Sequence, residues 1–151
     1  MESFDEIVRG CPVVLGMKGQ NVPEIVSELV GAMVSAGKLD ASLADSAAAA
    51  VLEREQLGST AISSGIAIPH GYLDGISGTA VAIGVQPVGV ECGAPDGEPS
   101  RIFVLMLNAS RTAAGHIKFL VSLNQRLLQS SVRERILIAR SREDVVSALC
   151  G

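Results

Sequence analysis

Apolar residues recur every three to four positions in the first third of the chain, which is the spacing of an amphipathic helix. Between residues 23 and 37, five apolar residues recur at helical spacing: Val26, Leu29, Val30, Met33 and Val34. A second helix is expected over 42–57, where Ser42 and Asp45 have the spacing of a capping box. The chain therefore begins its predicted core with two helices.

The middle of the chain has the pattern of β-strands. Residues 66–68 are a short apolar run between Gly and Pro, and residues 79–85 alternate Val, Ile and Val with small residues. Residues 101–108 are apolar on both faces, which is typical of a central strand. A turn is expected over 94–99, which contains Asp-Gly.

Three helical stretches follow, over 114–128, 131–140 and 141–150. The last two each begin with a serine and an acidic residue three positions later, as in a capping box: Ser131 with Glu134, and Ser141 with Asp144. Helices, then strands, then helices predict an α/β fold in which helices cover a sheet. No linker or repeat interrupts the pattern, so residues 1–151 are expected to form a single domain.

The length and composition of the chain are typical of a globular domain, and its charge argues against some functions. The chain has 151 residues, of which 48% are hydrophobic and 3% aromatic, so its core is expected to be aliphatic. The net charge is −4 and no run of Lys or Arg occurs, which argues against a nucleic-acid partner.

The cysteines and the chain start indicate a cytoplasmic protein. Cys11, Cys92 and Cys150 are odd in number and have neither disulfide-framework nor metal-ligand spacing, so we expect reduced thiols and no metal. The first ten residues lack the apolar segment of a secretory signal. No apolar run approaches the length of a membrane span, so no direct membrane insertion is expected.

One of the two histidines stands in the stretch GIAIPHG, residues 65–71. Pro69 has a fixed backbone angle and keeps Ile68 extended, and Gly71 allows a sharp change of direction after His70. The stretch is therefore expected to hold the imidazole rigidly near a strand end. The alternative is a polar loop residue without a task.

His116 and Arg54 are the next candidates, each with a structural alternative. His116 falls in the first turn of a predicted helix, where it could help hold a phosphate or make a local hydrogen bond. Arg54 lies near the end of the second helix. Its planar donor fork suits phosphate oxygens, and its charge also suits a helix C-terminus.

Ser59 and Thr60 follow that helix and could donate to an anion, or shape the loop. The chain lacks GxxxxGK[ST] and GxSxG, so neither a P-loop nor a hydrolase nucleophile elbow is supported.

Taken together, these segments resemble a known family. LEREQLGSTAISSGIAIPHG is similar to the signature of the IIA components of the bacterial phosphoenolpyruvate–sugar phosphotransferase system, of the fructose/mannitol type that includes nitrogen-regulatory IIA proteins. DGEP, AGHIKFLVSL and SREDVVSAL resemble the family's loop before the apolar strand, its second histidine segment and its closing helix. The resemblance runs from about Val22 to the end.

The resemblance implies a mixed β-sheet flanked by α-helices and a cytoplasmic phosphocarrier without cofactor. It implies that His70 is phosphorylated, that His116 is the second active-site histidine and that Arg54 is the active-site arginine. Ser59 and Thr60 fall on the family's S/T-T pair and are expected to bind phosphate. The implied donor is phospho-HPr, and the implied target is a IIB domain or a regulated transporter or kinase.

Two departures from the pattern occur. Ser63-Ser64-Gly65 replaces a step that is often G-N-G or G-E-G, and Arg101 replaces an apolar residue. Two alternatives also stay open: a regulatory binding protein whose output is docking, and an anion-binding scaffold without phosphotransfer. The sequence does not indicate a sugar, an oligomeric state or the phosphorylated ring nitrogen.

Overall fold

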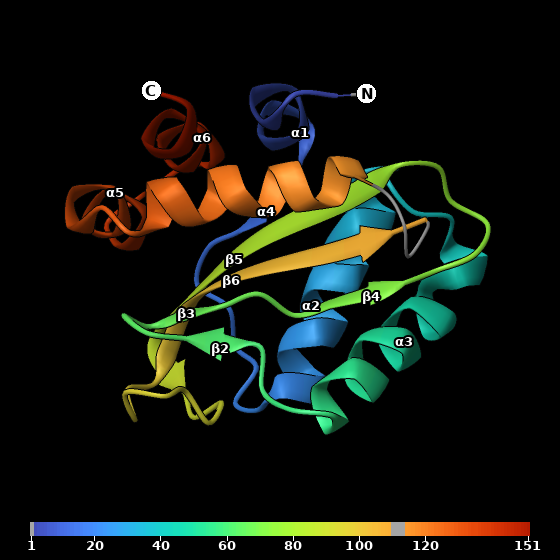
Figure 1. Ribbon diagram of the computed structural model, residues 1–151, viewed down its shortest axis with the longest axis horizontal. Helices are drawn as coiled ribbons and strands as arrows, with labels where there is room; N and C mark the ends of the chain where they lie inside the picture. The colour runs from blue at the N-terminus through green and yellow to red at the C-terminus, as the bar shows by residue number, and fades with distance from the viewer. Residues whose placement is uncertain (1, 110–113) are drawn as a thin grey trace.

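The computed structural model describes residues 2–109 and 114–151 and has one mixed sheet with helices on both faces (Figure 1). The strands are β1 (Val13–Val14), β2 (Ala61–Ile62), β3 (Ile66–Ala67), β4 (His70–Tyr72), β5 (Thr79–Val90) and β6 (Ser100–Asn108). The α-helices are α1 (Phe4–Gly10), α2 (Val22–Ser35), α3 (Ala44–Gln56), α4 (Ala114–Leu127), α5 (Ser130–Leu137) and α6 (Arg142–Cys150). A short 3-10 helix, Ala41–Leu43, precedes α3.

Strand β6 is the centre of the sheet. The strand order is β1-β5-β6-β3-β2, and β4 pairs with β6 off this path. The pairing of β5 with β6 is antiparallel, whereas β3 and β4 both run parallel to β6. The prediction of a central strand over 101–108 and the mixed sheet implied by the resemblance are both confirmed.

Strand β6 is buried on both faces, because an apolar core lies on each side of the sheet. Phe103, Leu105 and Leu107 belong to the core under α2 and α3. The alternate residues Ile102, Val104 and Met106 belong to the core under α1, α4, α5 and α6. Figure 1 shows these two groups of helices on opposite sides of the sheet. Side chains that alternate along a strand point to opposite faces, so one strand contributes to both cores.

The predicted capping boxes have different outcomes. The Ser141 hydroxyl accepts from the Asp144 amide at 3.1 Å, so that helix start is confirmed. The Ser42–Asp45 box is wrong, because Asp40 accepts from the Ser42 amide at 2.9 Å and begins the 3-10 helix instead. The Ser131–Glu134 box is also wrong. Helix α5 starts one residue earlier at Ser130, and its N-cap Gln129 makes no side-chain capping bond.

The structure also contains short elements that the pattern did not predict: α1, β1, β2 and β4. Strand β5 extends to Val90, past the predicted end at residue 85. The extension is possible because Gln86 accepts from the amides of Val88 and Gly89, at 2.8 and 3.1 Å, where the register with β6 shifts. The short strands pair with strands elsewhere in the chain, and α1 packs on α4 and α6.

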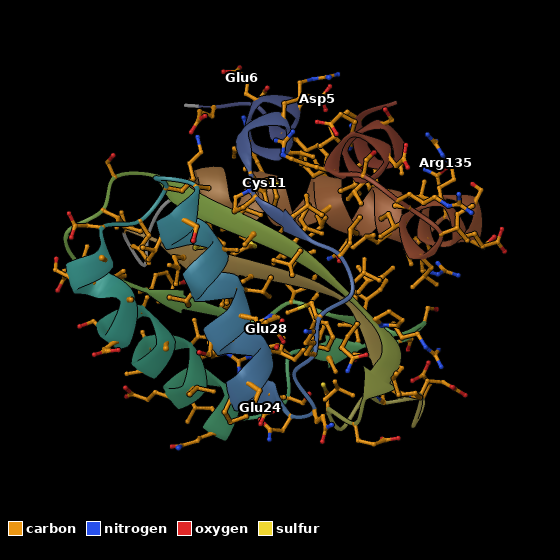
Figure 2. The ribbon with its side chains drawn as sticks, turned by 180° about the vertical axis from the view of Figure 1, so that it is seen from behind. Asp5, Glu6, Cys11, Glu24, Glu28 and Arg135 are labelled. Atoms are coloured by element: carbon orange, nitrogen blue, oxygen red, sulfur yellow. The ribbon has the colours of Figure 1, made fainter. Side chains whose placement is uncertain are left out.

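The cysteines are free thiols. Cys11 lies beneath α1, and burial raises the pKa of its thiol to about 11 (Figure 2). Burial also raises the thiol pKa values of Cys92 and Cys150. All three are therefore poor nucleophiles at neutral pH. Among the helices of residues 2–109 and 114–151, none is long and apolar enough to cross a membrane.

Candidate functional site

His70 is the first residue of β4, and backbone bonds hold the peptide on both sides of it. The Ile68 amide donates to the Thr60 carbonyl at 3.1 Å, and the Met106 amide donates to the Pro69 carbonyl at 3.0 Å. His70 itself aligns with Met106 of β6. The backbone before His70 is thus held by Pro69 and by hydrogen bonds to two other segments, at Thr60 and Met106.

The His70 ring has one nitrogen committed within its own turn. Its Nδ1 lies 2.9 Å from the Ile68 carbonyl oxygen. A carbonyl oxygen only accepts, so this contact requires the proton on Nδ1. The neutral ring then carries its free lone pair on Nε2. The geometry therefore leaves Nε2 as the ring nitrogen that is free to react or to accept a hydrogen bond.

Gly71 allows β4 to lie directly against α3. A Cβ at this position would stand 3.1 Å from both the Ala50 carbonyl carbon and the Val51 amide nitrogen. Those atoms are helix backbone, which cannot rotate away as a side chain can. The glycine therefore permits the close approach that brings the end of α3 to His70.

A cavity of about 220 Å³ lies between α3 and β4 and is lined by both His70 and Arg54. The Arg54 Nη1 donates to the Gly58 carbonyl at 2.8 Å, which steadies the guanidinium at the helix end. Within the described residues no carboxylate forms an ion pair with Arg54. Tyr72 and Leu57 also line the cavity, and Leu57 is 83% exposed at its edge.

His116 reaches the same region from α4. Its ring packs edge-on against the Tyr72 ring, with centroids 5.9 Å apart and planes at 70°. Partial burial lowers the pKa of His116, and the neighbouring charge of His70 lowers it further. Its Nδ1 is buried and finds no hydrogen-bond partner among the described residues. The structure thus brings together three of the residues singled out in the sequence.

Ser59 and Thr60 are placed differently. The Ser59 hydroxyl donates to the Cys92 carbonyl, and the Thr60 hydroxyl donates to the Glu55 carboxylate. Neither residue lines the cavity beside His70. Their bonds hold the loop between α3 and β2, and their role as phosphate ligands stays a prediction.

Tyr72 is the residue that the sequence reasoning missed. It lies two positions after His70 on the same strand, so both side chains are on one face of β4. It also lines the cavity and contacts His116. A strand over residues 70–72 would have indicated Tyr72, because residues two positions apart on a strand share a face.

The two departures from the family pattern have structural counterparts. Ser64 adopts a left-handed conformation, with φ of 70°, next to Gly65 at 78°. Its amide donates to the Asp96 carboxylate at 2.9 Å, which stabilises the turn despite the missing glycine. Arg101 donates from Nε to the Pro87 carbonyl at 3.2 Å. Neither change enters the His70 cavity.

Comparison with known proteins agrees with this geometry. The family model described as phosphoenolpyruvate-dependent sugar phosphotransferase system, EIIA 2, matches residues 10–150. The fructose-specific EIIA component of Haloferax volcanii is 32% identical over 121 residues, which are 80% of this chain and 77% of that protein. A nitrogen regulatory protein of Escherichia coli is 36% identical over 100 residues, 64% of this chain and 60% of that protein.

Solved structures show the same fold. The nitrogen regulatory protein IIA-Ntr of Neisseria meningitidis has a TM-score of 0.82 and 27% identity, and the match covers 95% of this chain and 98% of that one. Mannitol IIA of Escherichia coli, in its complex with phosphorylated mannitol IIB, has a TM-score of 0.76 and 27% identity, over 92% and 94% of the two chains. On the family match and these relatives, the chain belongs to the EIIA 2 family of the phosphoenolpyruvate-dependent sugar phosphotransferase system.

Proposed function

We propose that this chain is a phosphohistidine carrier, which accepts a phosphoryl group from phospho-HPr on Nε2 of His70. The observation that supports this most directly is the bond from Nδ1 to the Ile68 carbonyl, because it leaves Nε2 unprotonated beside the cavity. A neutral imidazole nitrogen is a competent nucleophile near neutral pH.

In the proposed step, the Nε2 lone pair attacks the phosphorus of the donor. The bond from phosphorus to the donor breaks, and its electron pair returns to the donor. The proton on the His70 Nδ1 stays hydrogen-bonded to the Ile68 carbonyl, which stabilises the charge that develops on the ring. In the onward transfer, a nucleophile of the acceptor protein attacks the phosphorus, the Nε2–P bond breaks, and its electron pair returns to Nε2.

Arg54 and His116 are proposed to stabilise the transferring group. Phosphoryl transfer is catalysed mainly by positioning and by compensation of charge. Arg54 supplies a permanent positive charge at the cavity, with no carboxylate paired to it among the described residues. His116 is mainly neutral at pH 7 by its lowered pKa and is proposed to donate a hydrogen bond to a phosphoryl oxygen. Ser59 and Thr60 are proposed as further phosphate contacts, which requires their present bonds to rearrange.

The proposed acceptor is a IIB domain, and the alternative output is regulation of a transporter or kinase by the phosphorylation state. The relatives support both the transfer role and the regulatory role, since they include a fructose-specific EIIA component and nitrogen regulatory proteins. A solved relative is a IIA–IIB complex, which supports a IIB acceptor for this chain.

The test is the intact mass of the protein after incubation with phosphoenolpyruvate, enzyme I and HPr. We expect one added phosphoryl group that is lost in acid and maps to the peptide containing residues 65–71. His70→Gln should remove it while the fold is retained. An unmodified protein beside visibly phosphorylated HPr, repeated with HPr from a second bacterium, would instead indicate the anion-binding scaffold.

Arg54 is tested in the same assay by the rate of labelling. Arg54→Gln should slow transfer roughly 100-fold to 1000-fold, because it removes a charged donor from the transition state. Arg54→Lys keeps the charge but loses the planar fork, so an intermediate rate is expected. A change in melting temperature without a change in rate would assign Arg54 a structural role only.

A further inference from the structure

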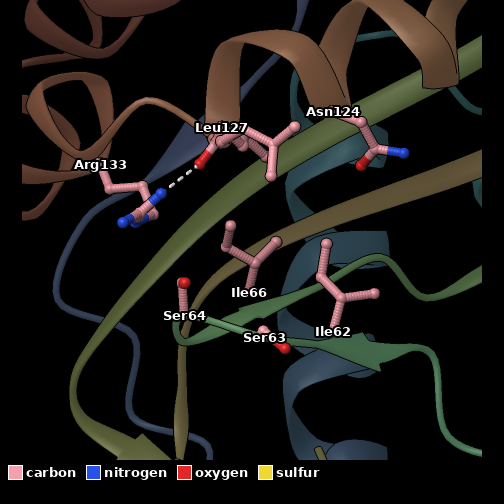
Figure 3. A pocket seen from close by; sticks show the side chains of 8 residues that line it. Ile62, Ser63, Ser64, Ile66, Asn124, Leu127 and Arg133 are labelled. Carbon is pink, nitrogen blue, oxygen red and sulfur yellow. Dashed lines mark hydrogen bonds between the residues drawn. The ribbon is translucent and has the colours of Figure 1, made fainter. Parts of the chain in front are cut away.

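A second cavity of about 350 Å³ lies at the other end of α4 from His116 (Figure 3). Its lining comes from the β2–β3 turn, the last turn of α4 and the start of α5. Asn124 and Leu127 are eight and eleven residues beyond His116, so along the helix they are roughly 12–16 Å away. The cavity is therefore separate from the proposed phosphorylation site.

Most of the cavity wall is aliphatic. Ile66 and Leu127 are fully buried at its base, while Ile62 and Leu128 stand at its edge. Leu128 is 78% exposed, which is costly for a large aliphatic side chain without a contact. The wall favours an apolar occupant of modest size.

Asn124 adds an unsatisfied acceptor to this apolar wall. Its Oδ1 is buried and has no hydrogen-bond donor among the residues that the structure describes. Figure 3 shows the amide oxygen turned toward the side of Ile62 and Ile66. A buried acceptor without a donor is unfavourable and rare, and indicates a missing hydrogen-bond partner.

Arg133 adds a positive charge at the same cavity. Its Nη1 donates to the Leu127 carbonyl at 2.7 Å, which fixes the guanidinium beside the lining residues (Figure 3). In residues 2–109 and 114–151, no carboxylate lies within ion-pair distance of it. The remaining N–H groups of the fork are suited to a carboxylate.

We propose that this cavity binds a small carboxylic acid that has a branched aliphatic body and one hydroxyl or amide donor. The carboxylate would bind Arg133, and the aliphatic body would cover Ile62, Ile66 and Leu128. The donor would satisfy the Asn124 Oδ1 after the ligand displaces the side chains that now bury it. A sugar does not match this site, because its many hydroxyl groups would be left without partners on the aliphatic wall.

The proposal is tested with 2-hydroxy-4-methylpentanoate as probe and the full chain labelled with ¹⁵N. We expect saturable chemical-shift changes at the backbone amides of Ile62, Ser63, Ser64 and Leu128, with no comparable change at His70. Acetate lacks the aliphatic body, and 4-methylpentan-1-ol lacks the carboxylate. Each should bind at least tenfold more weakly than the probe.

Variants assign the two polar contacts. Arg133→Gln should weaken the probe at least tenfold, whereas the matched control Arg135→Gln, on the exposed side of α5, should leave binding unchanged (Figure 2). Asn124→Ala should weaken the probe severalfold without lowering the melting temperature, because it removes an unsatisfied acceptor. Spectra of each variant report whether the fold is retained, and Arg133→Lys is the second variant should Arg133→Gln unfold.

Three results would overturn the proposal. Absence of saturable shifts up to the solubility limit of the probe would mean that the cavity holds only water. Equal binding of the alcohol would reduce the site to an apolar patch without a role for Arg133. Equal binding of acetate would reduce it to an anion contact.

Discussion

At the scale of single residues, the proposed phosphotransfer depends on the state of two imidazoles. The His70 Nδ1 is bound to the Ile68 carbonyl, and the His116 Nδ1 is buried without a partner among the described residues. The His70 ring therefore has an unprotonated Nε2, whereas the His116 ring has a lowered pKa. Their spacing in the sequence does not reveal this difference, because it depends on bonds and burial.

The titration of His116 is a direct test of this arrangement. Because the lowered pKa of His116 favours its neutral form in the folded state, we expect it to titrate below its ordinary value of 6.5. Phosphorylation of His70 should raise that pKa, since a negatively charged phosphoryl group nearby would stabilise the protonated His116 ring. NMR of the ring protons measures both values, with only two histidines to assign.

The same shift predicts how stability depends on pH. The unfolded chain binds the His116 proton more readily, so the free energy of unfolding should rise with pH across the window just below 6.5. His116→Gln should remove that part of the slope. A slope of the opposite sign, or a His116 pKa that falls on phosphorylation, would contradict the described surroundings of the ring.

At the scale of elements, the site depends on how closely β4 approaches α3. The contact brings Arg54, at the end of the helix, to the cavity beside His70. Gly71 is the residue that allows it, because its missing Cβ leaves room for the backbone at Ala50 and Val51.

We expect Gly71→Ala to lower the free energy of unfolding by about 1–3 kcal/mol, as an overpacked core does, and to slow phosphorylation of His70. Gly31→Ala is the matched control, since no atom beyond its chain neighbours and its own helix backbone lies within 4 Å of an added Cβ at that position. It should stabilise α2 by about 0.5–1 kcal/mol and leave phosphorylation unchanged. Chemical denaturation and labelling rates check both. Equal effects of the two variants would mean that the β4–α3 contact is looser than described.

Helix capping gives a second prediction at this scale. Ser141→Ala should cost about 1 kcal/mol, because it removes the bond to the Asp144 amide at the start of α6. Ser131→Ala should cost almost nothing, since α5 has no side-chain cap and Ser131 is already inside the helix. Denaturant midpoints compare the two. A larger loss at Ser131 than at Ser141 would reverse the assignment of the caps.

At the scale of the whole molecule, helices from the two ends of the chain form one layer. Arg142, at the start of α6, donates from Nε to the Cys11 carbonyl at 2.9 Å and from Nη2 to the Arg9 carbonyl. One side chain thus joins segments more than 130 residues apart. The family match begins at residue 10, so α1 is largely outside it, although it packs on α4 and α6.

Arg142→Gln should therefore lower the free energy of unfolding by about 1–3 kcal/mol, because two carbonyls lose a charged donor. The matched control is Arg140→Gln, an exposed arginine whose hydrogen bond to Asp144 is made by its backbone amide and not by its side chain. Chemical denaturation measures both. An unchanged unfolding midpoint for Arg142→Gln would show that packing alone holds α1 in place.

Local pattern determined a large part of this protein. The apolar periodicity predicts α2 and α4, and the two-sided apolar run predicts β6 as the central strand. Ser141 and its acidic partner predict the start of α6. These features depend on residues within one or two turns of each other, so rules of helix capping and side-chain alternation are sufficient for them. The motif around His70 also carries the resemblance to the family.

Tertiary structure alone decided the short strands and the geometry of the site. Strand β4 has three residues and forms because the backbone of β6 pairs with it. The predicted capping box at Ser42 does not form, because Asp40 accepts from the Ser42 amide instead. Arg54 and His70 belong to one motif of the sequence, but they meet in space because β4 pairs with β6 while lying against α3. His116 comes from a distant segment, α4, which covers the opposite face of the sheet. Such contacts arise from packing between distant segments, and no local pattern encodes them.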